Sequence, residues 1–106
     1  MAVYVDDAFI PADVPNGSRI HSSRWCHMTA DTTEELKAFA KKIGLRVSWI
    51  QNEGTNSEHF DLTEGKRRQA VRAGALEITW REAGIQVSCR RYGVPFDLSR
   101  IRNETP

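Results

Sequence analysis

Histidines and aspartates gather near the ends of the predicted secondary-structure elements. His27 lies within or just after one predicted strand, and His59 directly precedes a predicted helix. Imidazole nitrogens and carboxylate oxygens are ligands that proteins use for zinc, manganese and iron. The sequence therefore predicts a divalent-metal site with these ligands: Asp6, His27, Asp31 and His59.

The same histidines also support a chemistry that needs no metal. Two imidazoles that titrate near neutral pH can serve as general base and general acid across a phosphodiester. In this interpretation the catalytic residues are His27, His59 and Asp61, and Asp61 orients an imidazole. The two interpretations share residues, and a divalent metal remains a candidate cofactor only in the first.

A run of cations opens the second predicted helix. Lys66, Arg67 and Arg68 occupy its first turn, where free backbone N–H groups already attract anions. Cations at this end oppose the helix dipole, so helix stability does not explain them, whereas a bound phosphate would. The alternative is a structural role, in which they face water or pair with nearby acids: Glu58, Asp61 and Glu64.

Each candidate ligand also has a structural interpretation. Asp31 is well placed to cap a helix, and Asp61 or Thr63 to cap the next one. His27 could be a hydrogen-bonded core histidine, and Asp6 could simply end a strand.

Two helices and several strands must position these residues. Polar caps at 31–33, apolar residues at helical spacing and Gly44 predict a helix at about 32–43. Thr63 and Gly74 bound a second helix at about 64–73. Short β-prone runs predict five strands: 3–5, 25–30, 45–51, 76–80 and 85–89. The last of these is expected to form a hairpin with the strand at 76–80. This order predicts a single small layered α/β domain, with a mixed sheet of four or five strands.

Two segments fall outside this regular pattern. Residues 8–23 contain Pro11, Pro15 and Gly17 and predict a surface loop, of a length that is typical of functional or mobile loops. We expect residues 1–82 to form the α/β core, and residues 83–106 to add a C-terminal strand and an extended tail to the same domain.

Composition sets the class of protein. The 106 residues fit one domain, and a homodimer would be a simple way for so small a chain to bury more surface. The net charge of +1 is not that of a dedicated nucleic-acid binder, although the C-terminal part is basic. Without a visible targeting or membrane segment, we expect a cytoplasmic protein in which Cys26 and Cys89 are free thiols rather than a disulfide.

Several motifs occur together in a characteristic order: Val-Tyr-Val-Asp at 3–6, Trp-Cys-His-Met at 25–28 with Asp31, Glu-Glu-Leu-Lys-Ala-Phe-Ala at 34–40, His-Phe-Asp-Leu at 59–62 and Ala-Val-Arg-Ala-Gly-Ala at 70–75. Over roughly residues 2–82 the chain resembles the bacterial and phage family catalogued as domain of unknown function 4031. The resemblance implies that the five candidate acids and histidines belong to the family's motifs: Asp6, His27, Asp31, His59 and Asp61. It implies no activity, and both the 8–23 segment and the 83–106 segment depart from the family's pattern.

Two functions follow as expectations. The first is a small domain that acts on or binds a phosphate-containing ligand, such as a nucleotide or nucleic acid, through a His/Asp site with or without a metal. The second is a non-catalytic protein-binding module, for example a phage protein that inhibits a host protein. In that case residues 8–23 and 83–106 would carry the contacts.

Overall fold

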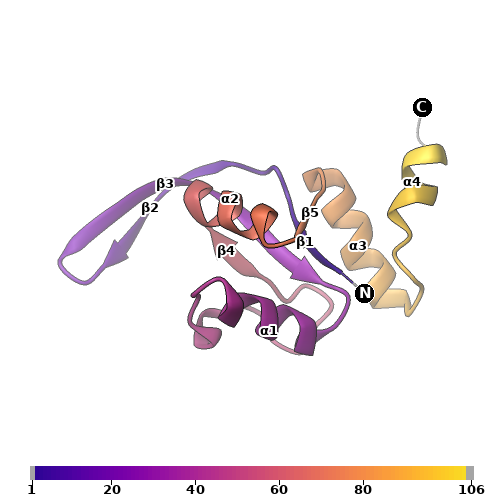
Figure 1. The fold of residues 1–106 in the computed structure, drawn as a ribbon, viewed down its shortest axis with the longest axis horizontal. Helices are drawn as coiled ribbons and strands as arrows, with labels where there is room; N and C mark the ends of the chain where they lie inside the picture. Colours follow the sequence, from indigo (N-terminus) through magenta and orange to yellow (C-terminus); the bar gives the residue numbers. More distant parts are fainter. Residues whose placement is uncertain (1, 105–106) are drawn as a thin grey trace.

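The computed structural model describes residues 2–104 and confirms the mixed α/β class (Figure 1). One five-stranded sheet carries helices around it. The elements follow one another as β1 (Val3–Val5), β2 (Ile10–Asn16), β3 (Arg19–Ala30), α1 (Thr33–Lys42), the 3-10 turn η1 (Val47–Trp49), β4 (Phe60–Leu62), α2 (Glu64–Arg72), β5 (Leu76–Glu77), α3 (Trp80–Tyr92) and α4 (Leu98–Glu104).

The sheet is organised around the long strand β3. Its first half pairs with β2, and its second half lies between β1 and β4, antiparallel to both. Met28 is therefore opposite Val5 on one side and opposite Phe60 on the other. β5 adds to β1 in parallel, which makes the sheet mixed.

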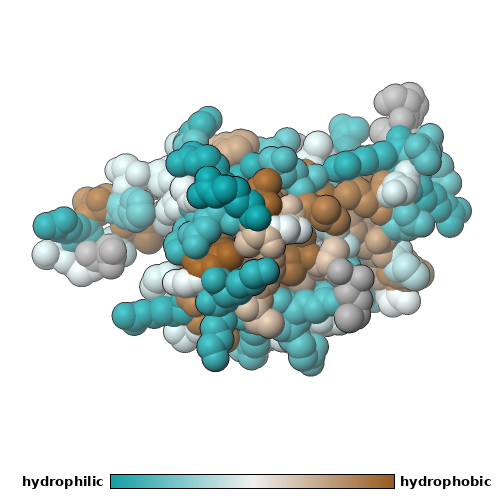
Figure 2. Space-filling model, viewed as in Figure 1, coloured by the Kyte–Doolittle hydropathy of each residue, from teal (hydrophilic) through white to brown (hydrophobic). Residues whose placement is uncertain are grey.

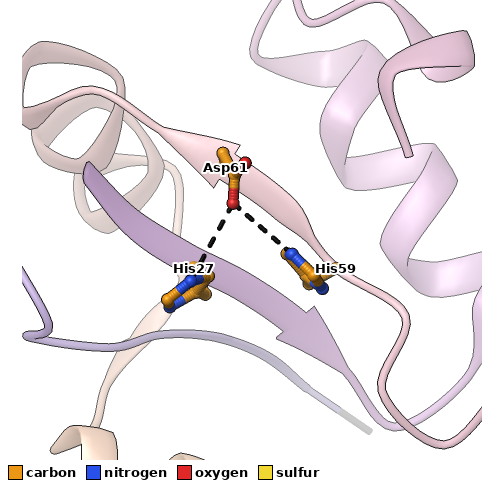
Figure 3. A group of neighbouring side chains, drawn as sticks. All are labelled: His27, His59 and Asp61. Atoms are coloured by element: carbon orange, nitrogen blue, oxygen red, sulfur yellow. Dashed lines mark ion pairs between the residues drawn. The ribbon is translucent and has the colours of Figure 1, made fainter. Parts of the chain in front are cut away.

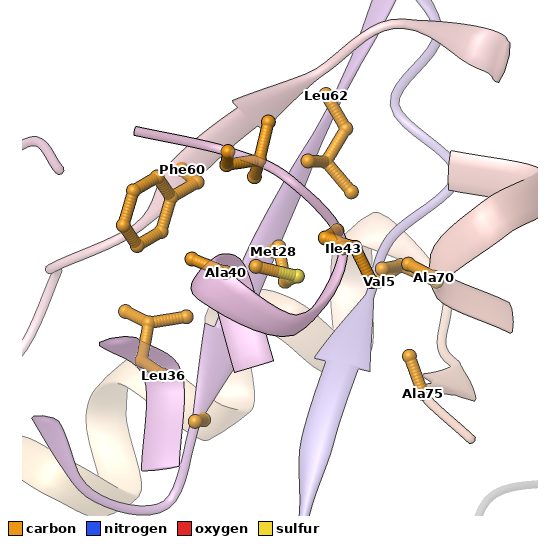
Figure 4. Close-up of a cluster of buried hydrophobic side chains, with 11 residues drawn as sticks. Val5, Met28, Leu36, Ala40, Ile43, Phe60, Leu62, Ala70 and Ala75 are labelled. Carbon is orange, nitrogen blue, oxygen red and sulfur yellow. The ribbon is translucent and has the colours of Figure 1, made fainter. Parts of the chain in front are cut away.

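The hydrophobic core lies on the face of the sheet that α1 and α2 cover (Figure 4). Met28 and Ala30 of β3 and Phe60 and Leu62 of β4 are at most 1% exposed and point into this core. Because successive side chains of a strand alternate between faces, the intervening residues of both strands point to the opposite face. That opposite face carries the polar side chains of interest.

Threonine side chains begin the two helices predicted from sequence. Thr32 caps α1 by accepting a hydrogen bond from the Glu35 N–H (3.2 Å), and Thr63 caps α2 by accepting one from the Lys66 N–H (3.2 Å). Asp31 does not cap α1 as its structural interpretation had it, because its carboxylate is directed to β1 instead. The predicted helix bounds of 32–43 and 64–73 are otherwise confirmed to within a residue or two.

The segment predicted as a loop at 8–23 is a β-hairpin, formed by β2 and the first half of β3. It extends from the body of the molecule as a two-stranded arm (Figure 1). The prolines that argued against regular structure fit here because the described pairings of β2 are all with β3, and an edge strand tolerates a missing N–H. Gly17 has a φ of 65° and makes the turn between the two strands.

The predicted strand at 45–51 is also wrong. Its alternating pattern instead forms η1 and the flanking extended residues, with Leu45 buried and Trp49 56% exposed. The predicted strand at 76–80 is shortened to the two residues of β5.

The C-terminal segment is helical, so the strand at 85–89 and the extended tail predicted within 83–106 are wrong; residues 105–106 lie outside the described part. A capping box begins α3, in which Thr79 and Glu82 each bond the other's backbone N–H. Gly93 ends the helix in the left-handed conformation, with a φ of 67°. α3 contacts the sheet through Gln86, whose side-chain amide donates to the carbonyl of Ala30 (3.0 Å).

Within residues 2–104, no helix combines the length and the apolar character that crossing a membrane requires. Cys26 is buried, Cys89 is partly buried, and both are free thiols, as expected.

Candidate metal site

The strand register brings three of the predicted residues together. His27 of β3 lies directly opposite Asp61 of β4, so the two side chains share one face of the sheet. His59 precedes Asp61 by two residues and points to the same side. Figure 3 shows both imidazoles directed at the Asp61 carboxylate. The alternation of side chains along β3 and β4 places them on the face opposite the hydrophobic core.

The separations within this group suit a single metal ion. Oδ1 of Asp61 lies 3.4 Å from Nε2 of His59 and 3.9 Å from Nε2 of His27. One ligand atom from each of the three residues lies within 4.8 Å of the others. Two ligands that each lie at most about 2.2 Å from one zinc ion can be at most about 4.4 Å apart. Small side-chain adjustments therefore suffice for all three to reach one ion.

Both imidazoles are anchored through the nitrogen that faces away from Asp61. Nδ1 of His27 lies 2.7 Å from Oδ2 of Asp6, and Nδ1 of His59 lies 2.9 Å from the carbonyl oxygen of Ser57. A carboxylate and a carbonyl only accept hydrogen bonds, so Nδ1 carries the proton in each neutral ring. The lone pair of each Nε2 is then free for a metal, an arrangement typical of metal-binding histidines.

Asp6 supports His27 rather than joining the group that faces the shared space. Its side chain is 4% exposed, and Oδ1 accepts hydrogen bonds from the N–H groups of His27 (2.9 Å) and Ala8 (3.2 Å). With Oδ2 bound to the His27 ring, both carboxylate oxygens are occupied. The structure thus gives Asp6 the role of orienting His27, which differs from the direct metal ligation that the sequence predicted.

Charge pairing shifts the pKa values of the group. The Asp6 carboxylate raises the pKa of His27 above its ordinary value, and the Asp61 carboxylate does the same for His59. When the His59 ring is protonated, its hydrogen bond to Asp61 in turn lowers the pKa of Asp61, with a further contribution from Gln51. Without a metal, the imidazoles therefore retain protons to higher pH, and metal binding would release protons.

Exchange of Asp6 for asparagine is expected to lower the pKa of His27 and to change its tautomer. The amide lacks the negative charge that stabilises the imidazolium. If its oxygen keeps the two backbone N–H bonds, its NH₂ group faces Nδ1, which must then accept, and the proton moves to Nε2. Histidine ring ¹⁵N and ¹³C shifts of the metal-free protein across a pH titration measure both effects. Asp13→Asn on the arm is the matched control, and an unchanged His27 titration in Asp6→Asn would contradict the assigned role of Asp6.

Asp31, the other predicted ligand, is used elsewhere. Its Oδ2 accepts from the Ala2 N–H (2.8 Å) and its Oδ1 from the hydroxyl of Tyr4 (2.8 Å). Burial, followed by the hydrogen bond to Asp31, raises the pKa of Tyr4 above its ordinary value. The structure thus joins Asp31 to the N-terminal strand and does not bring it into the group of His27, His59 and Asp61.

The basic run on α2 is partly committed to structural contacts. Lys66 donates to the carbonyl of Ile43 (2.7 Å), and Arg67 donates to the carbonyl of Asp6 (2.7 Å) and pairs with Glu77. Arg68 is exposed. Phosphate binding by these residues stays a prediction. The acids named as their alternative partners are engaged elsewhere: Glu58 with Arg90, Asp61 with the histidines and Glu64 with Arg24.

Sequence reasoning missed Gln51 and Glu58. The Gln51 side-chain amide donates to Oδ2 of Asp61, and its backbone pairs with His59. Glu58 is buried and anchors the segment that precedes His59. No local pattern indicated either role, because both depend on contacts across the folded loop at 52–58. A glutamine or a glutamate at these positions does not by itself indicate a role in a site.

A family model for a protein of unknown function, DUF4031, matches residues 3–90 of the 106. The chain belongs to this family. The DUF4031 match extends beyond residue 82, the end of the resemblance seen in the sequence, and includes all the residues of the candidate metal site together with most of α3. Comparisons with curated proteins and with solved structures found no match. The chemistry of this DUF4031 site therefore has to be derived from its own geometry.

Proposed function

We propose that this protein binds a divalent transition metal through Nε2 of His27, Nε2 of His59 and a carboxylate oxygen of Asp61. One observation carries the proposal: both imidazoles have Nδ1 bound to an acceptor and Nε2 directed at the same carboxylate oxygen. A pair of histidines that only stabilised the fold would not need both free nitrogens to converge. Two imidazoles and one carboxylate suit zinc or iron(II), and also manganese.

The site is open to solvent. The side chains of His27, His59 and Asp61 are 34%, 19% and 38% exposed. Structural zinc sites are closed by four protein ligands, whereas catalytic sites use three and leave a position for water or substrate. Three partly exposed ligands therefore favour a site that works on a ligand from solution.

The ligand class that we propose is phosphate-containing, such as a nucleotide or a nucleic acid. A divalent metal in such a site polarises a phosphoryl oxygen and acidifies bound water. The position of α2 supports this choice, because Arg67, although paired with Glu77, contacts the backbone of Asp6, which in turn holds the His27 ring. Arg68 is exposed on the same helix and, beside its attraction to Glu64, offers positive charge to an anion from solution.

Titration of zinc, cobalt and manganese into metal-stripped protein tests the proposal. We expect one ion per chain by calorimetry, followed by metal-dependent binding or hydrolysis of a mononucleotide, a dinucleotide or an aryl phosphodiester. Absence of metal binding would contradict the metal site. Metal binding without any effect on the three phosphate esters would contradict the ligand class. Hydrolysis that persists in excess chelator would assign His27 and His59 to acid–base catalysis instead.

The second candidate is the non-catalytic protein-binding module, which one observation favours. The arm formed by β2 and β3 projects from the body and exposes Ile10, Val14 and Ile20, the last to 70%. Figure 2 shows apolar colour on this projecting part, away from the core. The protein-binding module would become the better candidate if the protein bound neither a metal nor a phosphate ester while its arm remained folded.

We also propose a cytoplasmic location. Cys26 and Cys89 are both free thiols, as is usual in a reducing compartment. Measurement of the thiol state in protein isolated under alkylating conditions tests this location, and a disulfide between the two would contradict it.

A further inference from the structure

A side-chain amide holds the outer oxygen of Asp61. Nε2 of Gln51 donates to Oδ2 of Asp61, while Oδ1 faces the two imidazoles. The two carboxylate oxygens of Asp61 therefore differ: Oδ2 is hydrogen-bonded to Gln51, and Oδ1 faces the two imidazoles. With 38% of its side chain exposed, Asp61 depends on these polar contacts to fix its rotation.

The backbone fixes Gln51 next to the metal site. Gln51 and His59 exchange two hydrogen bonds, from Gln51 N–H to the His59 carbonyl (2.9 Å) and from His59 N–H to the Gln51 carbonyl (3.0 Å). The loop at 52–58 connects these two paired residues. Asp61 follows His59 by two residues on the same strand segment. The position of the amide is therefore tied to the strand that carries two of the three ligands.

We propose that Gln51 is a positioning residue that makes Asp61 a one-oxygen ligand. This proposal rests on the metal site proposed above. Carboxylates bind metals through one oxygen or through both. Because Gln51 engages Oδ2, Oδ1 alone is left to coordinate, and a further coordination position stays open for water or the phosphate-containing ligand. Hydrogen bonds to ligating carboxylates are among the outer contacts that tune metal sites.

Gln51 can be changed without disturbing the core. Its side chain is exposed, and the backbone bonds to His59 do not depend on its side chain. Gln51→Leu removes the donor at similar size. Gln69→Leu on α2 is the matched control, because Gln69 accepts a hydrogen bond from Lys66 and has none with the three ligands among its described contacts. Circular dichroism of both variants establishes that they fold.

Cobalt(II) titration, followed by visible absorption, tests the proposal. We expect Gln51→Leu to bind cobalt about 10–100-fold more weakly than wild type. We also expect weaker d–d bands, because a second Asp61 oxygen raises the coordination number. Gln69→Leu should match wild type in both respects. The change in the spectrum distinguishes positioning from a general loss of stability.

Three results would overturn the inference, and they differ from one another. A Gln51→Leu variant with wild-type affinity and spectrum overturns the role of Gln51 and leaves the metal site intact. Weaker binding with an unchanged spectrum shows that Gln51 does not set the coordination of Asp61. If the wild-type protein gives no cobalt spectrum, the metal site itself is wrong, and the role of Gln51 is overturned with it.

Discussion

Replacing His27 or His59 with alanine is expected to weaken divalent-metal binding by more than about 100-fold. Loss of an outer hydrogen-bond partner of a metal ligand typically costs 10–100-fold, and loss of the ligand itself should exceed that. Only three candidate ligands converge in the described site, so in the proposed complex removing one leaves two, too few for stable binding. Calorimetry and cobalt absorption on the purified variants measure the loss.

The control for this prediction is the third histidine. His21 lies on the arm and packs against the ring of Trp25, outside the group of three ligands. His21→Ala should bind metal as wild type does. Because His27→Ala removes a partner of the buried Asp6 carboxylate, His27→Gln serves as a second variant that retains a donor for it. Wild-type affinity in both His59→Ala and His27→Gln would rule out the proposed site.

The second large effect concerns stability. Replacing Glu58 with alanine is expected to lower the free energy of unfolding by about 3–5 kcal/mol, the usual cost of breaking a buried ion pair from one side. Glu58 is 0% exposed and accepts hydrogen bonds from the Thr33 hydroxyl (2.7 and 2.9 Å) and the Gly54 N–H (2.9 Å). It also pairs with Arg90 at 2.9 Å. Alanine would leave all three donors without this acceptor, and urea unfolding at neutral pH measures the cost.

The same carboxylate gives the stability a pH dependence of known sign. Burial alone would raise the pKa of Glu58, but the bonds from Gly54, Thr33 and Arg90 outweigh it and hold the pKa below its ordinary value. A lowered pKa in the folded state stabilises the protein above the ordinary pKa, and that contribution is lost as pH falls through the folded value. The difference in unfolding free energy between wild type and Glu58→Ala should therefore narrow in acid.

Glu53→Ala provides the comparison within the same loop. Glu53 pairs with Lys37 at the surface, and exposed pairs contribute about 0–1 kcal/mol. If Glu58→Ala lost no more stability than Glu53→Ala, the buried pair would not anchor the loop as the geometry indicates. A large loss at Glu58 alone would identify the 52–58 loop as a rigid support for His59.

The sequence contained enough local information for α1, α2 and β1. Their caps, apolar spacing and terminating glycines are local signals, and the structure confirms them. The end of β3 was also predictable, since residues 25–30 form a short β-prone run. His27 and His59 were selected for the site for the same reason, because they lie where such elements end.

The roles within the site depended on register, which no local pattern specifies. The pairing of His27 with Asp61 rather than with a neighbour decides which side chains share a face. The pairing of β1 with β3 places Asp6 behind His27 and directs Asp31 to Tyr4, so one predicted ligand supports His27 and the other lies outside the group. Contacts between segments that are distant in the chain thus decide which of the predicted residues face the candidate metal site and which do not.

The helix α3 was missed although its start signal was present. Thr79 and Glu82 have capping-box spacing, but Ile85, Val87 and Cys89 alternate as in a strand. The apolar residues of α3 do not gather on one helical face, which removed the periodic signal. The capping box, which specifies backbone geometry directly, was the better guide.

The parallel pairing of β1 with β5 has a consequence for how the chain folds during synthesis. Tyr4 is paired with Leu76, so the first strand made can acquire this neighbour only after the chain has been translated through that position. Closing so large a loop is entropically costly and slow. The carboxylate of Asp6 follows directly on this strand. Because β1 also pairs with β3, the contact of Asp6 with His27 does not depend on β5. We therefore expect nascent chains that stop before residue 76 to hold His27 already, but to leave the outer edge of β1 unpaired.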